Sequence, residues 1–199
     1  YASKRSDYPP FIAIDYEGGS VYIHQTHELL NLPSNMAIGR SEDKKNIPVL
    51  FYLLGLELKK TGINAVFSPS LDVNTEKNNP IINVRAFSDR KEVVEEMGEM
   101  VIDGFSSAGI ISTLKHFPGH GDTSVDSHLA LPVVGHEEKR WIDVELRPFK
   151  AAIDSGLEAV MTAHLLAPAF DENLPASVSH RITTGLLRDK LRFDGVVVT

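Results

Sequence analysis

Residues 115–128 contain the side chains of this sequence that are best suited to chemistry. The segment holds one lysine, three histidines and two aspartates. Two glycines and a proline in the same stretch predict a loop rather than a helix. Catalytic groups are often carried by loops that a rigid framework holds in place. We therefore expect this segment to form part of a functional site.

Asp126 and His128, two positions apart in this segment, are spaced for acid–base chemistry. An aspartate that accepts a hydrogen bond from one imidazole nitrogen fixes the tautomer of the ring. The other nitrogen is then free to transfer a proton. A lone His–Asp pair usually belongs to a solvated surface loop, but the many ionisable residues around this pair favour a catalytic dyad.

A metal site is an alternative interpretation of the same segment. Imidazole and carboxylate groups are common metal ligands. Their spacing here matches no standard zinc pattern, and the His-Glu-x-x-His form is absent. We expect no metal and no other cofactor, and a metal-dependent hydrolase stays as an alternative. The residues concerned are His116, His120, Asp122, Asp126 and His128.

Composition excludes several other classes of protein. The formal net charge of -7 argues against nucleic acid or an anionic membrane as the main partner. The absence of cysteine excludes disulfides and a cysteine nucleophile. No apolar run approaches the ~18 residues that a membrane helix needs. No signal peptide is visible, and the choice between cytoplasm and periplasm stays open.

Short apolar runs alternate with helical stretches along the chain. The runs are rich in Val, Ile or Phe and end at polar or turn residues, as do strands buried on both faces of a parallel sheet. Strand and helix in alternation indicate βαβ units. The expected strands are 11–15, 65–69, 111–116, 159–164 and 195–199, and the expected helices are 47–61, 89–108, 137–155 and 179–191.

The polar residues Asp15, Asp72, His116 and His164 lie at or just past the ends of the expected strands. In a (β/α)8 barrel those ends converge on one active-site face, whereas an open sheet gathers its ligands at one switch point. We therefore expect an α/β fold of the TIM-barrel type. A full barrel has eight strands and about 250 residues. Residues 1–199 are then one incomplete barrel domain of about five strands, truncated at both ends; a smaller five-stranded α/β domain is the alternative.

Residues 115–132 resemble the signature segment of the bacterial β-N-acetylglucosaminidases of glycoside hydrolase family 3. The segment 14–19 is similar to the family's Asp-x-Glu-Gly-Gly stretch, and 83–88 to its Arg-x-Phe-Ser turn. The resemblance runs from about residue 11 to the end of the chain. Further similar stretches follow in the family's order at 62–72, 161–164 and 195–199.

The resemblance implies a role for each candidate residue. His128 would be the acid/base, oriented by Asp126 on a mobile loop. Asp72 and His164 would support the pocket from nearby. Polar side chains at the bottom of the pocket would hydrogen-bond the sugar hydroxyls, and these are Asp15, Arg85, Lys115 and His116.

The implied activity is that of a retaining glycosidase. It would release terminal β-linked N-acetylglucosamine from peptidoglycan fragments or chitin-type oligosaccharides. A retaining glycosidase needs a nucleophilic carboxylate and a proton donor. A histidine with a pKa near ~6.5 can both donate and accept a proton around neutrality. The Asp-x-His pair separates this branch of the family from the β-glucosidases.

Two positions depart from the family's pattern. The family's nucleophile is an aspartate directly after the strand that matches 195–199, and this sequence ends at Thr199. Where the family often has an arginine, this sequence has Ile23. A catalytically inactive sugar-binding fragment is therefore the alternative to an active enzyme. Of two other conspicuous residues, we expect Glu17 to form structural hydrogen bonds and Trp141 to pack in the core.

Overall fold

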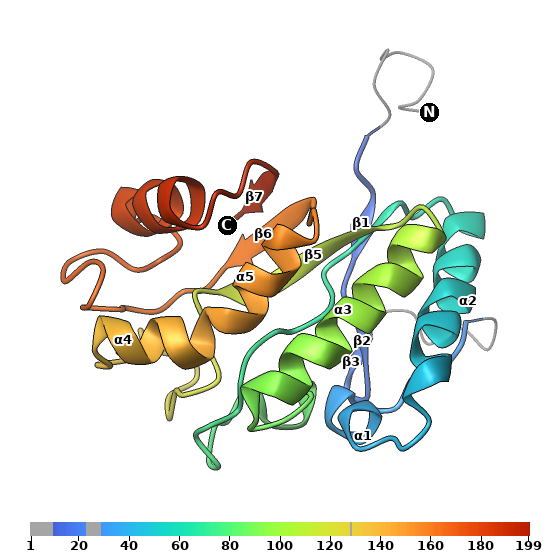
Figure 1. Ribbon diagram of the computed structural model, residues 1–199, viewed down its shortest axis with the longest axis horizontal. Helices are drawn as coiled ribbons and strands as arrows, with labels where there is room; N and C mark the ends of the chain where they lie inside the picture. Colours follow the sequence, from blue (N-terminus) through green and yellow to red (C-terminus); the bar gives the residue numbers. More distant parts are fainter. Residues whose placement is uncertain (1–9, 23–28, 128) are drawn as a thin grey trace.

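The computed structural model describes residues 10–22, 29–127 and 129–199 of the chain. Five parallel strands form one curled sheet with the order β1-β4-β5-β6-β7 (Figure 1). The sheet confirms the predicted parallel α/β fold and has the shape of part of a (β/α) barrel. The strands are β1 (Ala13–Ile14), β4 (Ala65–Val66), β5 (Ile111–Phe117), β6 (Ala159–Thr162) and β7 (Val196–Val198).

Helices cover the convex face of this sheet (Figure 1). The main ones are α2 (Ile47–Lys60), α3 (Lys91–Ser107) and α5 (Arg147–Asp154), followed by a π-helical segment at Arg181–Lys190. Shorter elements are α1 (Asn35–Gly39), α4 (Glu138–Arg140), a π-helical turn at Trp141–Glu145, and 3-10 turns at Lys44–Asn46 and Asn83–Arg85. Within the described ranges, no helix combines the length and apolar character that crossing a bilayer requires.

Two features of the fold differ from the sequence prediction. The expected helix 137–155 is divided into α4, a π-helical turn and α5, because Pro148 in the first turn of α5 has no backbone N–H to donate to the preceding turn. A small antiparallel hairpin, β2 (Tyr16–Gly18) with β3 (Val21–Tyr22), was not predicted. Strands of two or three residues are too short to show an alternating pattern.

The core lies between the sheet and the helices. Helices α2 and α3 pack so closely that a Cβ at Gly104 would lie 2.6 Å from the carbonyl oxygen of Pro48. Beside this contact, Phe51 and Phe105 form an edge-to-face pair with ring centroids 5.3 Å apart. Trp141 is fully buried, which confirms its predicted role in core packing. The core therefore holds the strands rigidly while their carboxyl ends carry the polar loops.

Candidate active site

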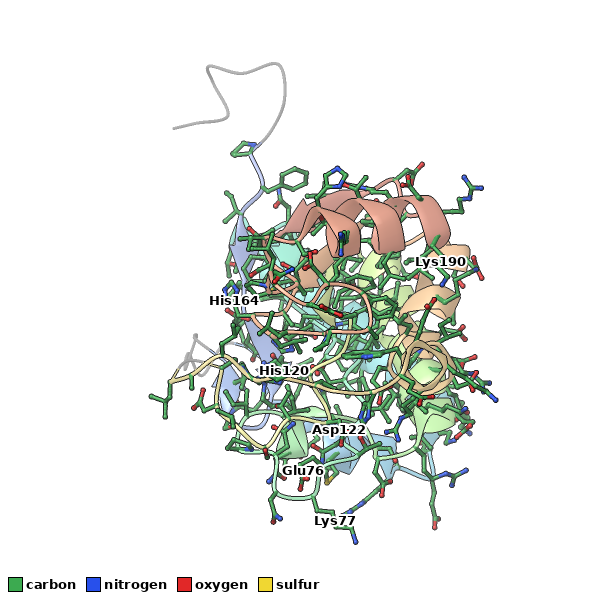
Figure 2. All side chains as sticks on the ribbon, turned by 90° about the vertical axis from the view of Figure 1, so that its left-hand side faces the viewer. Glu76, Lys77, His120, Asp122, His164 and Lys190 are labelled. Atoms are coloured by element: carbon green, nitrogen blue, oxygen red, sulfur yellow. The ribbon has the colours of Figure 1, made fainter. Side chains whose placement is uncertain are left out.

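A cavity of about 510 Å³ opens beside the carboxyl ends of the strands. Loops that follow different strands contribute to it, which explains why its residues are far apart in sequence. Two of its histidines, His120 and His164, are labelled in the left half of Figure 2, whereas Lys190, which does not line the cavity, is at the right. The polar residues that line the cavity are Asp15, Arg85, Lys115, His116, His120, Ser127, Thr162, His164 and Thr199. The cavity thus brings together all four of the predicted sugar ligands.

Glu17 lies at the centre of the charged groups beneath this cavity. Its carboxylate accepts two hydrogen bonds from Arg85, each 2.8 Å long, in a bidentate arrangement. The same carboxylate lies 2.5 Å from the Nζ atom of Lys115, which also donates to Asp15 at 2.8 Å. Glu17 is 1% exposed and Lys115 2% exposed. The carboxylate therefore fixes both cations in place, consistent with the structural role predicted for it.

The charges in this cluster stabilise one another. Burial alone would raise the pKa of Glu17, but the hydrogen bond from Arg85 and the charge of Lys115 hold that pKa below its ordinary value. Burial alone would lower the pKa of Arg85, but Glu17 holds it above its ordinary value. Glu17 and Arg85 therefore both stay ionised near neutral pH.

Asp72 holds His116 although Asp72 itself is fully buried. Its carboxylate accepts from the His116 ring nitrogen Nδ1 at 2.7 Å and from the His116 backbone N–H at 3.2 Å. It also accepts from the Ser70 hydroxyl at 2.8 Å and from the His120 backbone N–H at 2.7 Å. Burial would raise the pKa of Asp72, but the nearby His116 and its hydrogen bond hold that pKa well below its ordinary value. Asp72 is therefore an ionised support for the loop.

His120 is a buried ring that the sequence suggested only as a metal ligand. Its Nδ1 atom lies 2.9 Å from the hydroxyl of Thr123, and its Nε2 atom has no hydrogen-bond partner among the described residues. Burial holds the pKa of His120 below its ordinary value, although the charge of Asp72 opposes this. The ring is therefore neutral near pH 7 and lines the cavity beside His116, with the two centroids 5.8 Å apart.

His164 lies on the cavity wall rather than behind it. It is exposed there, and its Nδ1 atom lies 2.7 Å from the hydroxyl of Ser177. A side chain in this position can contact a ligand directly. His164 therefore joins the predicted sugar ligands in the cavity, while Asp72 lies behind them.

The predicted dyad is only partly within the described residues. Asp126 lies in the loop after β5, where its carbonyl oxygen accepts from the backbone N–H groups of Leu129 and Ala130, both at 3.0 Å. Its neighbour Ser127 lines the cavity. His128 and Ile23 lie outside the described residues. In the part of the chain that is described, no three His, Asp or Glu side chains are grouped closely enough to hold a metal ion.

Residues 1–199 match the sequence profile described as "Glycosyl hydrolase family 3 N terminal domain". The chain is 40% identical over 211 aligned positions to beta-hexosaminidase A of Pseudoalteromonas piscicida, covering 98% of this chain and 35% of that protein. It superimposes with a TM-score of 0.94 on a family 3 β-N-acetylglucosaminidase structure from Paenibacillus sp. str. FPU-7, at 45% identity, covering 98% of this chain and 37% of that one.

A second solved structure, NagZ from Neisseria gonorrhoeae in complex with N-trifluoroacetyl-D-glucosamine, gives a TM-score of 0.88 at 32% identity. The alignment covers 94% of this chain and 56% of that one. The chain therefore belongs to glycoside hydrolase family 3, as its signature segment predicts. It spans between about a third and just over half of the length of these relatives.

Two features of the cavity were not predicted from the sequence. These are the ion pairs of Glu17 with Arg85 and Lys115, and the place of His120 in the cavity lining, since His120 was expected only as a possible metal ligand. The position of Glu17 after a strand and before two glycines predicted only structural hydrogen bonds at the loop, and its burial is seen in the structure. The partners of Glu17 could not be read from that signal, because they come from other strands.

Proposed function

We propose that this chain is the sugar-binding part of a retaining β-N-acetylhexosaminidase that releases terminal β-linked N-acetylglucosamine. The observation that carries the proposal is the cavity in which Asp15, Arg85, Lys115 and His116 meet over the buried carboxylate of Glu17. The glucosaminidase and hexosaminidase names of its relatives support the same activity. The proposed substrates are peptidoglycan fragments or chitin-type oligosaccharides.

The charged residues suit the recognition of sugar hydroxyls. Arg85 and Lys115 supply N–H donors that Glu17 holds in fixed positions, and the carboxylate of Asp15 supplies an acceptor. Hydrogen bonds to charged groups are stronger than those between neutral groups. Because ionised Asp72 holds the proton on Nδ1 of His116, the Nε2 atom of His116 can accept a hydrogen bond beside Arg85. These groups together would hold one pyranose ring.

The proposed chemistry uses Asp126 and His128 as the acid/base pair. Asp126 would orient the His128 ring, and His128 would protonate the leaving oxygen and then activate the acceptor. The nucleophile would be an aspartate that follows Thr199 in a longer chain. Residues 1–199 would then contribute one barrel-type domain of five strands to this site. Ser127, which lines the cavity between the two dyad positions, supports this placement of the loop.

Two alternatives to this proposal make different predictions. The 199 residues alone would be an inactive sugar-binding fragment if the nucleophile lies beyond them. A metal-dependent hydrolase built on the histidine-rich loop would require a metal for activity. We propose no metal, no nucleic acid and no membrane as partners; a carbohydrate is the only proposed ligand.

The decisive experiment measures hydrolysis of nitrophenyl N-acetyl-β-glucosaminide and of nitrophenyl β-glucoside. Both the longer chain and the 199-residue chain are assayed. We expect the longer chain to hydrolyse the N-acetyl substrate in preference to the glucoside, and the shorter chain to hydrolyse neither. A folded longer chain that hydrolyses neither substrate would overturn the proposed activity. Preference for the glucoside would overturn the proposed specificity.

A further inference from the structure

The loop that carries Asp126 is anchored at both ends. At its first end, the side chain of Asn79 donates to the carbonyl oxygens of His120 at 2.9 Å and Gly121 at 3.1 Å. A Cβ at Gly121 would lie 1.9 Å from the carbonyl oxygen of Val73, so only glycine fits against this backbone. At its second end, the backbone N–H of Val134 donates to Leu166 at 2.9 Å.

A hydrogen-bonded pair, Asp122 and His136, joins the two ends directly. The Nε2 atom of His136 contacts one carboxylate oxygen of Asp122, and the two residues are 14 positions apart. The other carboxylate oxygen accepts from the hydroxyl of Thr75 at 2.9 Å. Thr75 comes from the loop after β4, so the pair ties two neighbouring strand-end loops together. In Figure 2, Asp122 is seen between His120 and Glu76.

His136 rests on a rigid support. Its ring meets the buried ring of Trp141 edge to face, with centroids 6.2 Å apart. Arg140 from the same region donates to the hydroxyl of Thr75 at 3.3 Å and to Glu145 at 3.1 Å. The carboxylate of Asp122 is thus held by groups that are themselves fixed by the core. A contact of this kind can define a loop position.

Thr123 at the start of the loop is buried, whereas the described residues from 124 to 131 are exposed or half-buried. Leu129 is 84% exposed, and Val125 is 40% exposed. A segment with few buried contacts depends on its ends for its position. Closing a loop at its base reduces the number of conformations that it can adopt. The Asp122–His136 contact is therefore well placed to determine where Asp126 lies.

We propose that Asp122 and His136 are positioning residues that hold the acid/base loop over the sugar cavity. They do not contact the substrate; they fix the stem of the loop that carries Asp126. The proposal rests on the proposed function, because it assumes that this dyad protonates the leaving group. It also makes a claim about the loop alone: without the pair, residues 123–131 become less ordered.

The kinetic test compares three variants of the longer chain with the wild type. Asp122→Asn keeps the shape of the side chain, His136→Phe keeps the ring on Trp141 but removes the hydrogen bond, and the third variant combines both. Asp154→Asn and His180→Gln, both at exposed helix positions, are the controls. The measured quantity is kcat/KM for dinitrophenyl N-acetyl-β-glucosaminide and for N,N′-diacetylchitobiose.

Comparing the two substrates distinguishes a misplaced acid/base loop from a general loss of activity. The dinitrophenyl leaving group needs no proton, whereas the sugar leaving group of chitobiose does. We expect each single variant to lower kcat/KM for chitobiose roughly 5- to 30-fold, as loss of one charged hydrogen bond would, with about a twofold change or less for the dinitrophenyl substrate. The double variant should lose no more than the worse single variant, because the two residues act as one unit. Equal losses on both substrates, or additive losses, would overturn the proposal.

Amide hydrogen exchange tests the loop without using activity. In Asp122→Asn and His136→Phe, exchange of residues 123–131 should become faster while exchange in β5 and α3 stays unchanged. Unchanged exchange of 123–131 would overturn the ordering role. An inactive wild type would overturn the proposed function, and the exchange result would still decide whether the pair orders the loop.

Discussion

The carboxylate of Asp72 binds His116 at two points: Oδ1 accepts the backbone N–H at 3.2 Å, and Oδ2 accepts the ring nitrogen Nδ1 at 2.7 Å. Because Asp72 is ionised, it can only accept, and the ring must carry its proton on Nδ1. The opposite nitrogen, Nε2, lies 3.4 Å from the guanidinium of Arg85, which can only donate, so in the neutral ring Nε2 is the acceptor. A buried aspartate therefore decides the hydrogen-bonding character of a histidine in the cavity.

Replacing Asp72 with asparagine should reverse this character. The asparagine oxygen would satisfy the backbone N–H groups, and its NH₂ group would face Nδ1, so the proton of His116 would move to Nε2. We expect kcat/KM for the N-acetyl substrate to fall about 10- to 100-fold, the range for a lost hydrogen bond to a charged group. Steady-state kinetics of the longer chain measure this effect, with the exposed Asp103→Asn variant as a control. An unchanged kcat/KM would show that the tautomer of His116 is unimportant.

Glu17→Gln should be strongly destabilising. The substitution leaves the buried cation of Lys115 and the partly buried cation of Arg85 beside a neutral amide, and removing one partner of a buried ion pair costs roughly 3–5 kcal/mol. The free energy of unfolding in urea measures this cost. Glu138→Gln, which breaks the exposed pair with Lys190, should cost about 1 kcal/mol or less. Similar losses in the two variants would contradict the central role of Glu17.

Stability should fall in acid because the pKa values of Asp72 and Glu17 are lowered in the folded protein. A group with a lowered folded pKa contributes its full stabilisation above its unfolded pKa, which is about 4 for a carboxyl group. That contribution is lost as the pH falls from about 4 towards the lowered folded value. Thermal unfolding midpoints measured between neutral pH and pH ~3 test the direction. Asp72→Asn should make the unfolding midpoint depend less on pH. The same pH dependence in the variant and the wild type would contradict a lowered pKa for Asp72.

The effect of removing the Asp126–His128 dyad should depend on the leaving group of the substrate. We expect His128→Ala in the longer chain to lower turnover of chitobiose by ~10²–10⁴-fold, the usual share of general acid–base catalysis. Dinitrophenyl substrates should lose much less kcat/KM, since their leaving groups need little protonation. Asp126→Asn should act in the same direction through the histidine tautomer. Equal loss on both substrates would argue against His128 as the acid.

Removal of metal should leave the activity unchanged. The proposed mechanism uses carboxylates and histidines and assigns no step to a metal ion. Dialysis of the longer chain against a chelator, followed by assay with nitrophenyl N-acetyl-β-glucosaminide, is the measurement. Loss of activity that added zinc restores would favour the metal-dependent alternative, whose expected ligands are His116, His120, Asp122, Asp126 and His128.

The amino-acid sequence alone was enough to predict the family, the strand–helix alternation and four of the polar residues that line the cavity, Asp15, Arg85, Lys115 and His116. These properties are local: the motif at 115–132 is contiguous, and apolar runs of strand length are visible without any contact between distant residues. Residues at the ends of strands could be assigned to one face because all parallel strands of a barrel point the same way.

Which charged groups pair with one another is seen only in the folded protein. Glu17 and Arg85 are 68 positions apart, and Asp15 and Lys115 are 100 positions apart. The contact between Asp122 and His136 likewise depends on where two loop ends meet over Trp141. Ion pairs and hydrogen bonds act over a few ångströms, so their partners are set by how the strands and loops pack, and no local pattern in the chain specifies that packing.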